Sequence, residues 1–209
     1  MLSSLVTKDR SALIFIEFQN EWLSPEGLLQ QRLIVDKEPF QHSIGQAAKV
    51  LDAARKTGWT IAHAGLDLSD DRQFRLFGGG HNKLGLRGAI PKAGTWDEVG
   101  SRFVEPFMPR AGEFVSKGRS GASVLKNATL DPFLRNNEIN TLFLMGYATH
   151  VCVESSLREA HDLGYNAYVV SDACAAFERV QHEHVLKHVV HHFGDVTDAQ
   201  SLVDRMLAT

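Results

Sequence analysis

The chain has 209 residues, 44% of them hydrophobic, which is enough for one substantial core and predicts a single domain over residues 1–209. Its net charge is -3, from 22 basic and 25 acidic residues mixed along the sequence, so the sequence has neither a basic stripe for nucleic acid nor an acidic tail. We therefore expect the partner to be a small molecule or another copy of the chain.

The two cysteines, Cys152 and Cys174, are too few for a disulfide framework, and the first ten residues lack the apolar core of a signal peptide. The longest apolar runs, such as residues 142–145, are far shorter than the ~20 residues that a membrane helix needs. We therefore expect a cytoplasmic protein without a membrane partner.

Residues 12–16 form a continuous apolar run rich in branched and aromatic side chains, which is typical of a strand covered on both faces. Glu17 follows directly. A carboxylate at the tip of a buried strand is costly unless it has a partner or a task, so Glu17 is a candidate functional residue. Residues 22–33 contain Pro25 and Gly27 and predict a loop with a short helix at the edge of a pocket.

Apolar positions recur at helical spacing over residues 38–56, and residues 59–64 form the next predicted strand. This strand, helix, strand order implies a parallel crossover. Residues 65–110 are crowded with glycine and proline and predict one long connection with a short helix at 96–103, serving as a lid or an oligomer contact. The glycine-rich segment 78–94 is predicted to be flexible, because no Gly-Lys-Ser/Thr of a phosphate loop follows its triple glycine.

The second half of the chain continues the alternation. Strands are predicted over residues 113–117, 141–145, 166–170 and 195–196, with helices over 123–135, 151–163 and 180–193. The pattern predicts a three-layer α/β/α domain, with a six-stranded, mainly parallel sheet and helices on both faces, as in Rossmann-like folds.

Cys152 follows the strand at 141–145, beyond the turn at Gly146, in the first turn of the predicted helix. Unpaired backbone NH groups and the helix dipole at that position favour a thiolate, as a nucleophile requires. The competing interpretation is packing, because cysteine is among the most buried residue types. Cys174 is interpreted as packing only.

Three polar residues, Glu17, Lys117 and Cys152, lie at or just beyond the carboxyl ends of predicted strands. Open sheets of this kind bind ligands at that edge. A carboxylate to take the thiol proton and a cation to stabilise the thiolate are the parts of an activated thiol nucleophile. The competing interpretation of Lys117 is a solvated lysine at a strand end.

Four motifs together resemble the isochorismatase-like hydrolase superfamily, and within it the cysteine hydrolases that act on amides and ureido groups. They are Glu17-Phe18-Gln19-Asn20, Val115-Ser116-Lys117 followed by Ser120, Gly146-Tyr147-Ala148-Thr149-His150-Val151-Cys152-Val153, and Val170-Ser171-Asp172-Ala173-Cys174-Ala175. The resemblance extends over about residues 12–196. It implies that Cys152 is the nucleophile, that Lys117 stabilises its thiolate, and that Glu17 is the general base.

The resemblance also implies a cis peptide bond between Tyr147 and Ala148, and an oxyanion hole made of the backbone NH groups of Ala148 and Cys152. Phe18, Trp22 and Tyr147 are candidate pocket residues. The family usually has Asp where this chain has Glu17, and the extra methylene moves the carboxylate by ~1.5 Å.

Neither histidine-containing segment matches a known metal motif. His63-Ala64-Gly65-Leu66-Asp67 departs from the Asp-x-His pattern of nicotinamidases, and the helix with His184, His188, His191 and His192 lacks the Glu of zinc proteases. We therefore expect no catalytic metal and no cofactor, and we assign the histidine helix to the surface or a subunit contact. The family resemblance implies a homodimer or homotetramer.

The expected function is that of a metal-independent cysteine hydrolase, which cleaves a carbon–nitrogen bond of a small amide or ureido substrate through a thioester. Two alternatives stay open. One is vinyl-ether hydrolysis of the isochorismatase type, which needs an acid and no nucleophilic thiol. The other is a catalytically inactive, oligomeric binding protein of the same fold.

Overall fold

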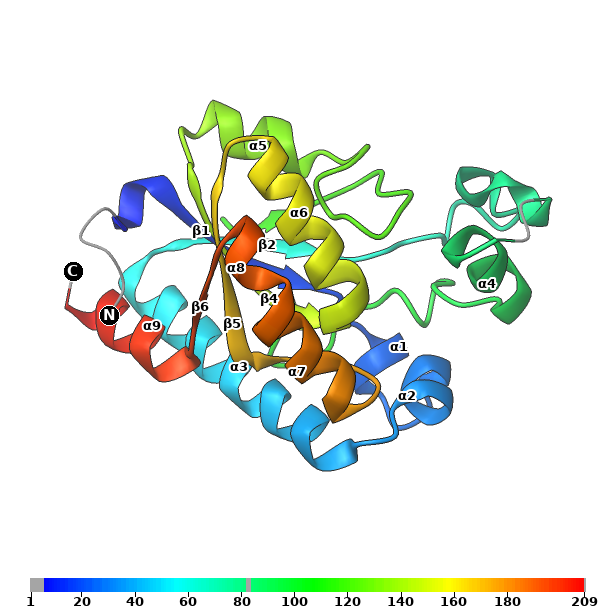
Figure 1. Ribbon diagram of the computed structural model, residues 1–209. Helices are drawn as coiled ribbons and strands as arrows, with labels where there is room; N and C mark the ends of the chain where they lie inside the picture. The colour runs from blue at the N-terminus through cyan, green and yellow to red at the C-terminus, as the bar shows by residue number, and fades with distance from the viewer. Residues whose placement is uncertain (1–5, 82–83, 209) are drawn as a thin grey trace.

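A six-stranded parallel sheet organises the chain in the computed structural model, which describes residues 6–81 and 84–208 (Figure 1). The strand order is β3-β2-β1-β4-β5-β6. Helices cover both faces of the sheet, so the predicted α/β/α architecture is confirmed. The strands are β1 (Ser11–Ile16), β2 (Thr60–Ala64), β3 (Phe114–Val115), β4 (Thr141–Tyr147), β5 (Asn166–Ala175) and β6 (Asp195–Thr197).

Most of the α-helices form two groups, one on each face of the sheet. The long helix α3 packs with α9 on one face of the sheet, and α6, α7 and α8 pack together on the other (Figure 1). The remaining α-helices are α1, α2, α4 and α5. Their bounds are α1 (Asn20–Leu23), α2 (Leu28–Leu33), α3 (Lys37–Thr57), α4 (Leu86–Ala93), α5 (Leu130–Asn136), α6 (Glu154–Asp162), α7 (Arg179–His188), α8 (Val190–Phe193) and α9 (Ala199–Leu207), with short helical turns η1 (Lys8–Arg10), η2 (Arg75–Gly80) and η3 (Thr149–Val153).

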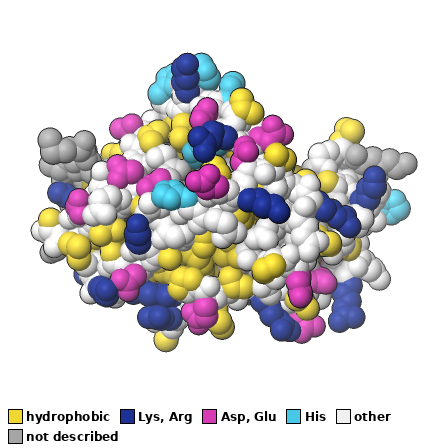
Figure 2. Space-filling model, turned by 90° about the horizontal axis from the view of Figure 1, so that it is seen from below, with side chains coloured by type: hydrophobic (Ala, Val, Ile, Leu, Met, Phe, Trp, Pro, Cys, Tyr) yellow, Lys and Arg dark blue, Asp and Glu magenta, His cyan; other side chains and the backbone are white. Residues whose placement is uncertain are grey.

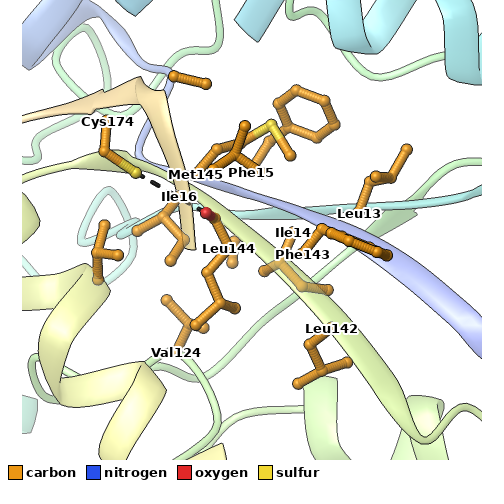
Figure 3. Close-up of a cluster of buried hydrophobic side chains, with 14 of the residues drawn as sticks. Leu13, Ile14, Phe15, Ile16, Val124, Leu142, Phe143, Leu144, Met145 and Cys174 are labelled. Carbon is orange, nitrogen blue, oxygen red and sulfur yellow. Dashed lines mark hydrogen bonds between the residues drawn. The ribbon is translucent and has the colours of Figure 1, made fainter. Parts of the chain in front are cut away.

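The two central strands, β1 and β4, are buried at every position because helices cover both of their faces. Figure 3 shows their side chains packed side by side, with Leu13 to Ile16 next to Leu142 to Met145. This continuous burial explains why both strands read as unbroken apolar runs in the sequence.

The chain order reverses between β1 and β4. The chain first builds outward from β1 through β2 to β3, and then crosses to start the second half at β4, next to β1. Such a switch point opens a crevice beyond the carboxyl ends of the two strands. The strands lie very close there, because Gly146 pairs with Ile16 and a Cβ at position 146 would collide with the Ile16 carbonyl oxygen.

The predicted helix at residues 96–103 is wrong, because Trp96 has a positive φ of 67° and the segment runs as turns to an isolated bridge between Gln19 and Phe103. The predicted helix at 123–135 forms only from Leu130, since Asn127, with φ 55°, interrupts any right-handed helix before it. The helix expected at 180–193 is divided into α7 and α8. Helix α9 was not predicted.

The long connection after β2 is not one structureless loop. It contains η2 and α4, which lie together and project from the body of the molecule on the right of Figure 1. Residues 82–83, inside the glycine-rich segment, lie outside the described residues.

On the face seen from below, basic and acidic side chains are interspersed (Figure 2). Of the helices in the described part of the chain, none combines the length and apolar character needed to cross a lipid bilayer.

Candidate functional site

Glu17 lies immediately after β1 and is 2% exposed. Its φ is 60°, a left-handed backbone conformation that costs a residue with a Cβ ~1–2 kcal/mol. Both carboxylate oxygens are held in this position. Oε1 is 2.6 Å from Nη2 of Arg119, and Oε2 accepts a hydrogen bond of 2.7 Å from Nε1 of Trp22. The carboxylate at the strand tip therefore has fixed partners, as its burial requires.

Arg119 provides the cation of the site, and its side chain is 3% exposed. Its guanidinium also donates hydrogen bonds to the backbone carbonyls of Gly121 and Ala122, while Nη1 is buried without an acceptor among the described residues. Burial alone would lower the pKa of Arg119, but its interactions with the Glu17 carboxylate and with Cys152 outweigh burial and raise the pKa. The guanidinium therefore stays charged.

Cys152 lies in the turn η3, just before α6, and is 6% exposed. Its backbone carbonyl accepts a hydrogen bond of 2.6 Å from Ser156 Oγ, which in turn accepts the NH of Val124. Burial raises the pKa of the Cys152 thiol, the carboxylate of Glu17 raises it further, and Arg119 opposes both. The expectation that the helix dipole favours a thiolate is wrong for this resting state, because desolvation and a neighbouring carboxylate outweigh a partial charge.

Lys117 is not part of this cluster. Its side chain is 66% exposed, and Nζ lies 3.9 Å from Oδ2 of Asp67. Strand β3 ends at Val115, and the chain then turns through Gly118, with φ 80°, so that residue 119 rather than residue 117 points inward. Lys117 was predicted because it ends the strand in the sequence, whereas Arg119 lies two residues further on and was not predicted. A second basic residue just beyond a glycine was the available signal.

The structure contains the cis peptide bond between Tyr147 and Ala148 that the resemblance implies. Ala148 lines the same cavity as Cys152, so both residues of the predicted oxyanion hole border one cavity.

Of the three predicted pocket residues, only Trp22 lines the cavity. Phe18 is fully buried and stacks on Phe107, with ring centroids 4.2 Å apart. Tyr147 is also fully buried, and its hydroxyl is 3.1 Å from Ser43 Oγ. The core takes both rings because the segment after β1 and the end of β4 pack against α3 and the segment around Phe107.

The cavity above Cys152 has a volume of about 220 Å³. Glu17, Arg119 and Cys152 are all among the residues that line it. The other walls come from α1 and α2, from α4, from residues 95–96 and from Phe177. Helix α4 of the projecting arm thus borders the site, and so does α2, which lies in the segment 22–33 that was predicted to be at the edge of a pocket.

The motif after Glu17 fixes one of these walls. The side-chain amide of Gln19 exchanges two 3.0 Å hydrogen bonds with the backbone of Leu66. Asn20 donates to the Val99 carbonyl at 2.9 Å, and Oε1 of Glu21 accepts the NH of Trp96 at 3.1 Å. These polar residues therefore hold the loop that brings Trp96 to the cavity.

His63 and Asp67 have other partners. His63 is fully buried, and Nε2 lies 2.7 Å from Oε2 of Glu113, which also pairs with Arg55 at 2.7 Å. Burial lowers the pKa of His63. Asp67 accepts hydrogen bonds from the NH and hydroxyl of Ser69. Both side chains thus contribute to local structure.

The histidines of the C-terminal helices form two close ring pairs, His184 with His188 at 5.1 Å and His191 with His192 at 4.1 Å between centroids. Within residues 6–81 and 84–208, no group of three or more His, Cys, Asp and Glu side chains is arranged to hold a metal ion.

Comparison with known proteins gives consistent matches over nearly the whole chain. Ureidoacrylate amidohydrolase RutB of Acinetobacter baylyi is 28% identical over 208 residues, covering 94% of this chain and 83% of that protein. The fold is similar to that of a cysteine hydrolase from Pseudomonas syringae pv. phaseolicola, with a TM-score of 0.81 and 20% identity over 97% of this chain and 95% of that one.

N-carbamoylsarcosine amidase from Thermoplasma acidophilum is also similar in fold, with a TM-score of 0.65 and 23% identity over 91% of this chain and 96% of that one. The sequence model described as the Isochorismatase domain matches residues 11–201, which is most of the chain and contains every residue of the site. The chain therefore belongs to the isochorismatase family of hydrolases.

Proposed function

We propose that this protein is a cysteine hydrolase that cleaves a carbon–nitrogen bond of a small amide or ureido substrate, with Cys152 as the nucleophile. The observation that carries the proposal is the buried contact of a thiol, a carboxylate and a guanidinium, Cys152, Glu17 and Arg119, at one cavity. The names of the similar proteins, an amidohydrolase of ureidoacrylate and an amidase of N-carbamoylsarcosine, agree with this bond class.

In the first step Glu17 accepts the proton of the Cys152 thiol as the sulfur attacks the substrate carbonyl carbon. A carbon–sulfur bond forms, and the electron pair of the carbonyl moves to its oxygen. The backbone NH groups of Ala148 and Cys152 are the proposed donors to this oxyanion. Once Glu17 is neutral, the charge of Arg119 acts on the sulfur alone, which offsets the high pKa of the resting thiol.

The intermediate then collapses with cleavage of the carbon–nitrogen bond. Glu17 gives its proton to the leaving nitrogen, and a thioester remains on Cys152. A water molecule next transfers a proton to Glu17 and attacks the thioester carbon. The sulfur leaves, and Glu17 returns the proton to it, which restores the starting state.

The test is a panel of amides and ureas assayed for release of ammonia, with intact-mass detection of an acyl adduct. Cys152→Ala should abolish turnover and the adduct. Cys174→Ala is the matched control, because Cys174 is 4% exposed and its Sγ lies 3.8 Å from the Leu144 carbonyl oxygen, inside the core (Figure 3). Undiminished turnover by Cys152→Ala would refute the thiol mechanism, and a vinyl-ether substrate or a pure binding role would then have to be considered.

A further inference from the structure

The wall of the cavity above Cys152 is almost entirely apolar. Beyond the reacting group of side chains it is formed by leucines of α2 and by apolar residues of α4, together with Trp96 and Phe177. Trp96 is 2% exposed. Trp22 and Phe177, which also line the cavity, stack with their ring centroids 5.9 Å apart. A pocket of this kind gains affinity from apolar surface that the substrate removes from water.

The charges inside the cavity cancel. Glu17 and Arg119 are paired at 2.6 Å, and the buried thiol is neutral at rest. The third charged residue of the lining, Arg32, is exposed to solvent on α2. A charged substrate group placed next to the thiol would therefore lose its hydration beside an ion pair that is already neutral, which is strongly unfavourable. The donor beside the thiol that has no partner among the described residues, Nη1 of Arg119, belongs to that neutral pair.

The size of the cavity limits what it can hold. Its volume is about 220 Å³, and an apolar protein cavity of ~150 Å³ is large enough for benzene. One six-membered ring or one branched alkyl group therefore fits together with the reacting amide.

We propose that the substrate is a primary amide or urea whose scissile group carries an uncharged, apolar substituent, a branched alkyl chain or one aromatic ring, and that this substituent occupies the cavity. The inference rests on the proposed C–N hydrolase function and adds the substrate class. It differs from what the ureidoacrylate of the similar amidohydrolase would suggest, since that molecule carries a carboxylate close to its ureido group.

The test compares kcat/KM for acetamide, isovaleramide, phenylacetamide and succinamate. Each added methylene in an apolar pocket is worth ~10–200-fold. We therefore expect isovaleramide and phenylacetamide to exceed acetamide at least about a hundredfold. Succinamate, which has a carboxylate on a chain of similar length, should not exceed acetamide. If succinamate or acetamide is the best substrate, the inference is overturned while the proposed function stands.

A pair of variants tests the cavity itself. Leu29→Gln places an amide in the lining, and Leu23→Gln makes the same change at a partly buried leucine outside the lining. The readout is the ratio of kcat/KM for phenylacetamide to that for acetamide, which is independent of the folded fraction. This ratio should fall at least about tenfold in Leu29→Gln and stay unchanged in Leu23→Gln. Equal effects in the two variants contradict the inference.

If none of the four amides is hydrolysed and no adduct forms, the proposed function is in question, and binding decides the inference separately. Calorimetric titration of Cys152→Ala with phenylacetamide and with succinamate gives the two affinities without turnover. Tighter binding of phenylacetamide supports an apolar cavity, whereas equal or weaker binding overturns it.

Discussion

Replacing Arg119 with Met tests whether this residue, rather than Lys117, is the cation of the site. The ion pair between Arg119 and Glu17 is short, at 2.6 Å, and both side chains are 3% exposed. Removing the guanidinium leaves the Glu17 carboxylate buried without a counter-ion, which costs ~3–5 kcal/mol. Because total stability is only ~5–15 kcal/mol, urea unfolding followed by tryptophan fluorescence should show this loss clearly.

The matched control is Lys117→Met. Because Lys117 is 66% exposed, this variant should unfold within ~0.5 kcal/mol of the original protein and keep its turnover. Arg119→Met should lose turnover at least about a hundredfold. The double variant Glu17→Gln/Arg119→Met should recover part of the lost stability, because it contains no unpaired buried charge at this site. Arg119 is not the cation of the site if Lys117→Met loses turnover while Arg119→Met keeps both turnover and stability.

Three further outcomes follow from the geometry. Burial alone would raise the pKa of Glu113, but hydrogen bonds from Arg55, the Arg110 backbone and His63 lower this pKa from 4.5 to about 2. The ionised Glu113 therefore stabilises the folded state above pH 4.5, and this contribution is lost as the pH falls toward 2. Glu113→Gln should therefore flatten the dependence of Tm on pH in that window; an unchanged slope would contradict this. Glu17→Asp should withdraw the carboxylate by ~1.5 Å and lower kcat ~100-fold, as a kinetic assay on the substrate found would show. Iodoacetamide labelling of Cys152, measured by peptide mass spectrometry, should become about tenfold faster per pH unit from pH 6 to 9, because the pKa of the thiol is raised. A labelling rate that levels off below pH 8 would contradict a raised pKa.

The strands that carry the site could be predicted because their sequences have one dominant signal. β1 and β4 are buried on both faces, so their apolar runs end where the sheet ends, and the polar residues beyond them had to lie at its carboxyl edge. Glu17 and Cys152 were found for this reason, and the structure brings them to one cavity.

Arg119 could not be found in the same way. Strand β3 has only two residues at the edge of the sheet, so no periodic pattern determines which later side chain points inward. The direction is set by the backbone turn at Gly118 and by the carbonyls of Gly121 and Ala122, which orient the guanidinium. Contacts of this kind depend on the fold of the loop and cannot be predicted from the spacing of residue types along the sequence.

The protonation state of Cys152 was mispredicted for a related reason. A sequence shows that a thiol precedes a helix, and the dipole argument follows from that alone. It does not show how completely the thiol is removed from water, or that a carboxylate from a strand 135 positions earlier lies beside it. Both effects raise the pKa of the thiol, and both arise only from tertiary packing.

The three side chains of the site make the apolar cavity compatible with the proposed chemistry. A neutral thiol, a carboxylate and a guanidinium sum to zero charge, and transfer of the proton from Cys152 to Glu17 leaves the sum at zero. The low-dielectric surroundings therefore penalise neither state by its net charge, whereas a lone thiolate in the same cavity would be strongly disfavoured. An arginine suits this task better than the expected lysine, because its fork binds Glu17 and two backbone carbonyls at once, which keeps the positive charge fixed while the negative charge moves from oxygen to sulfur.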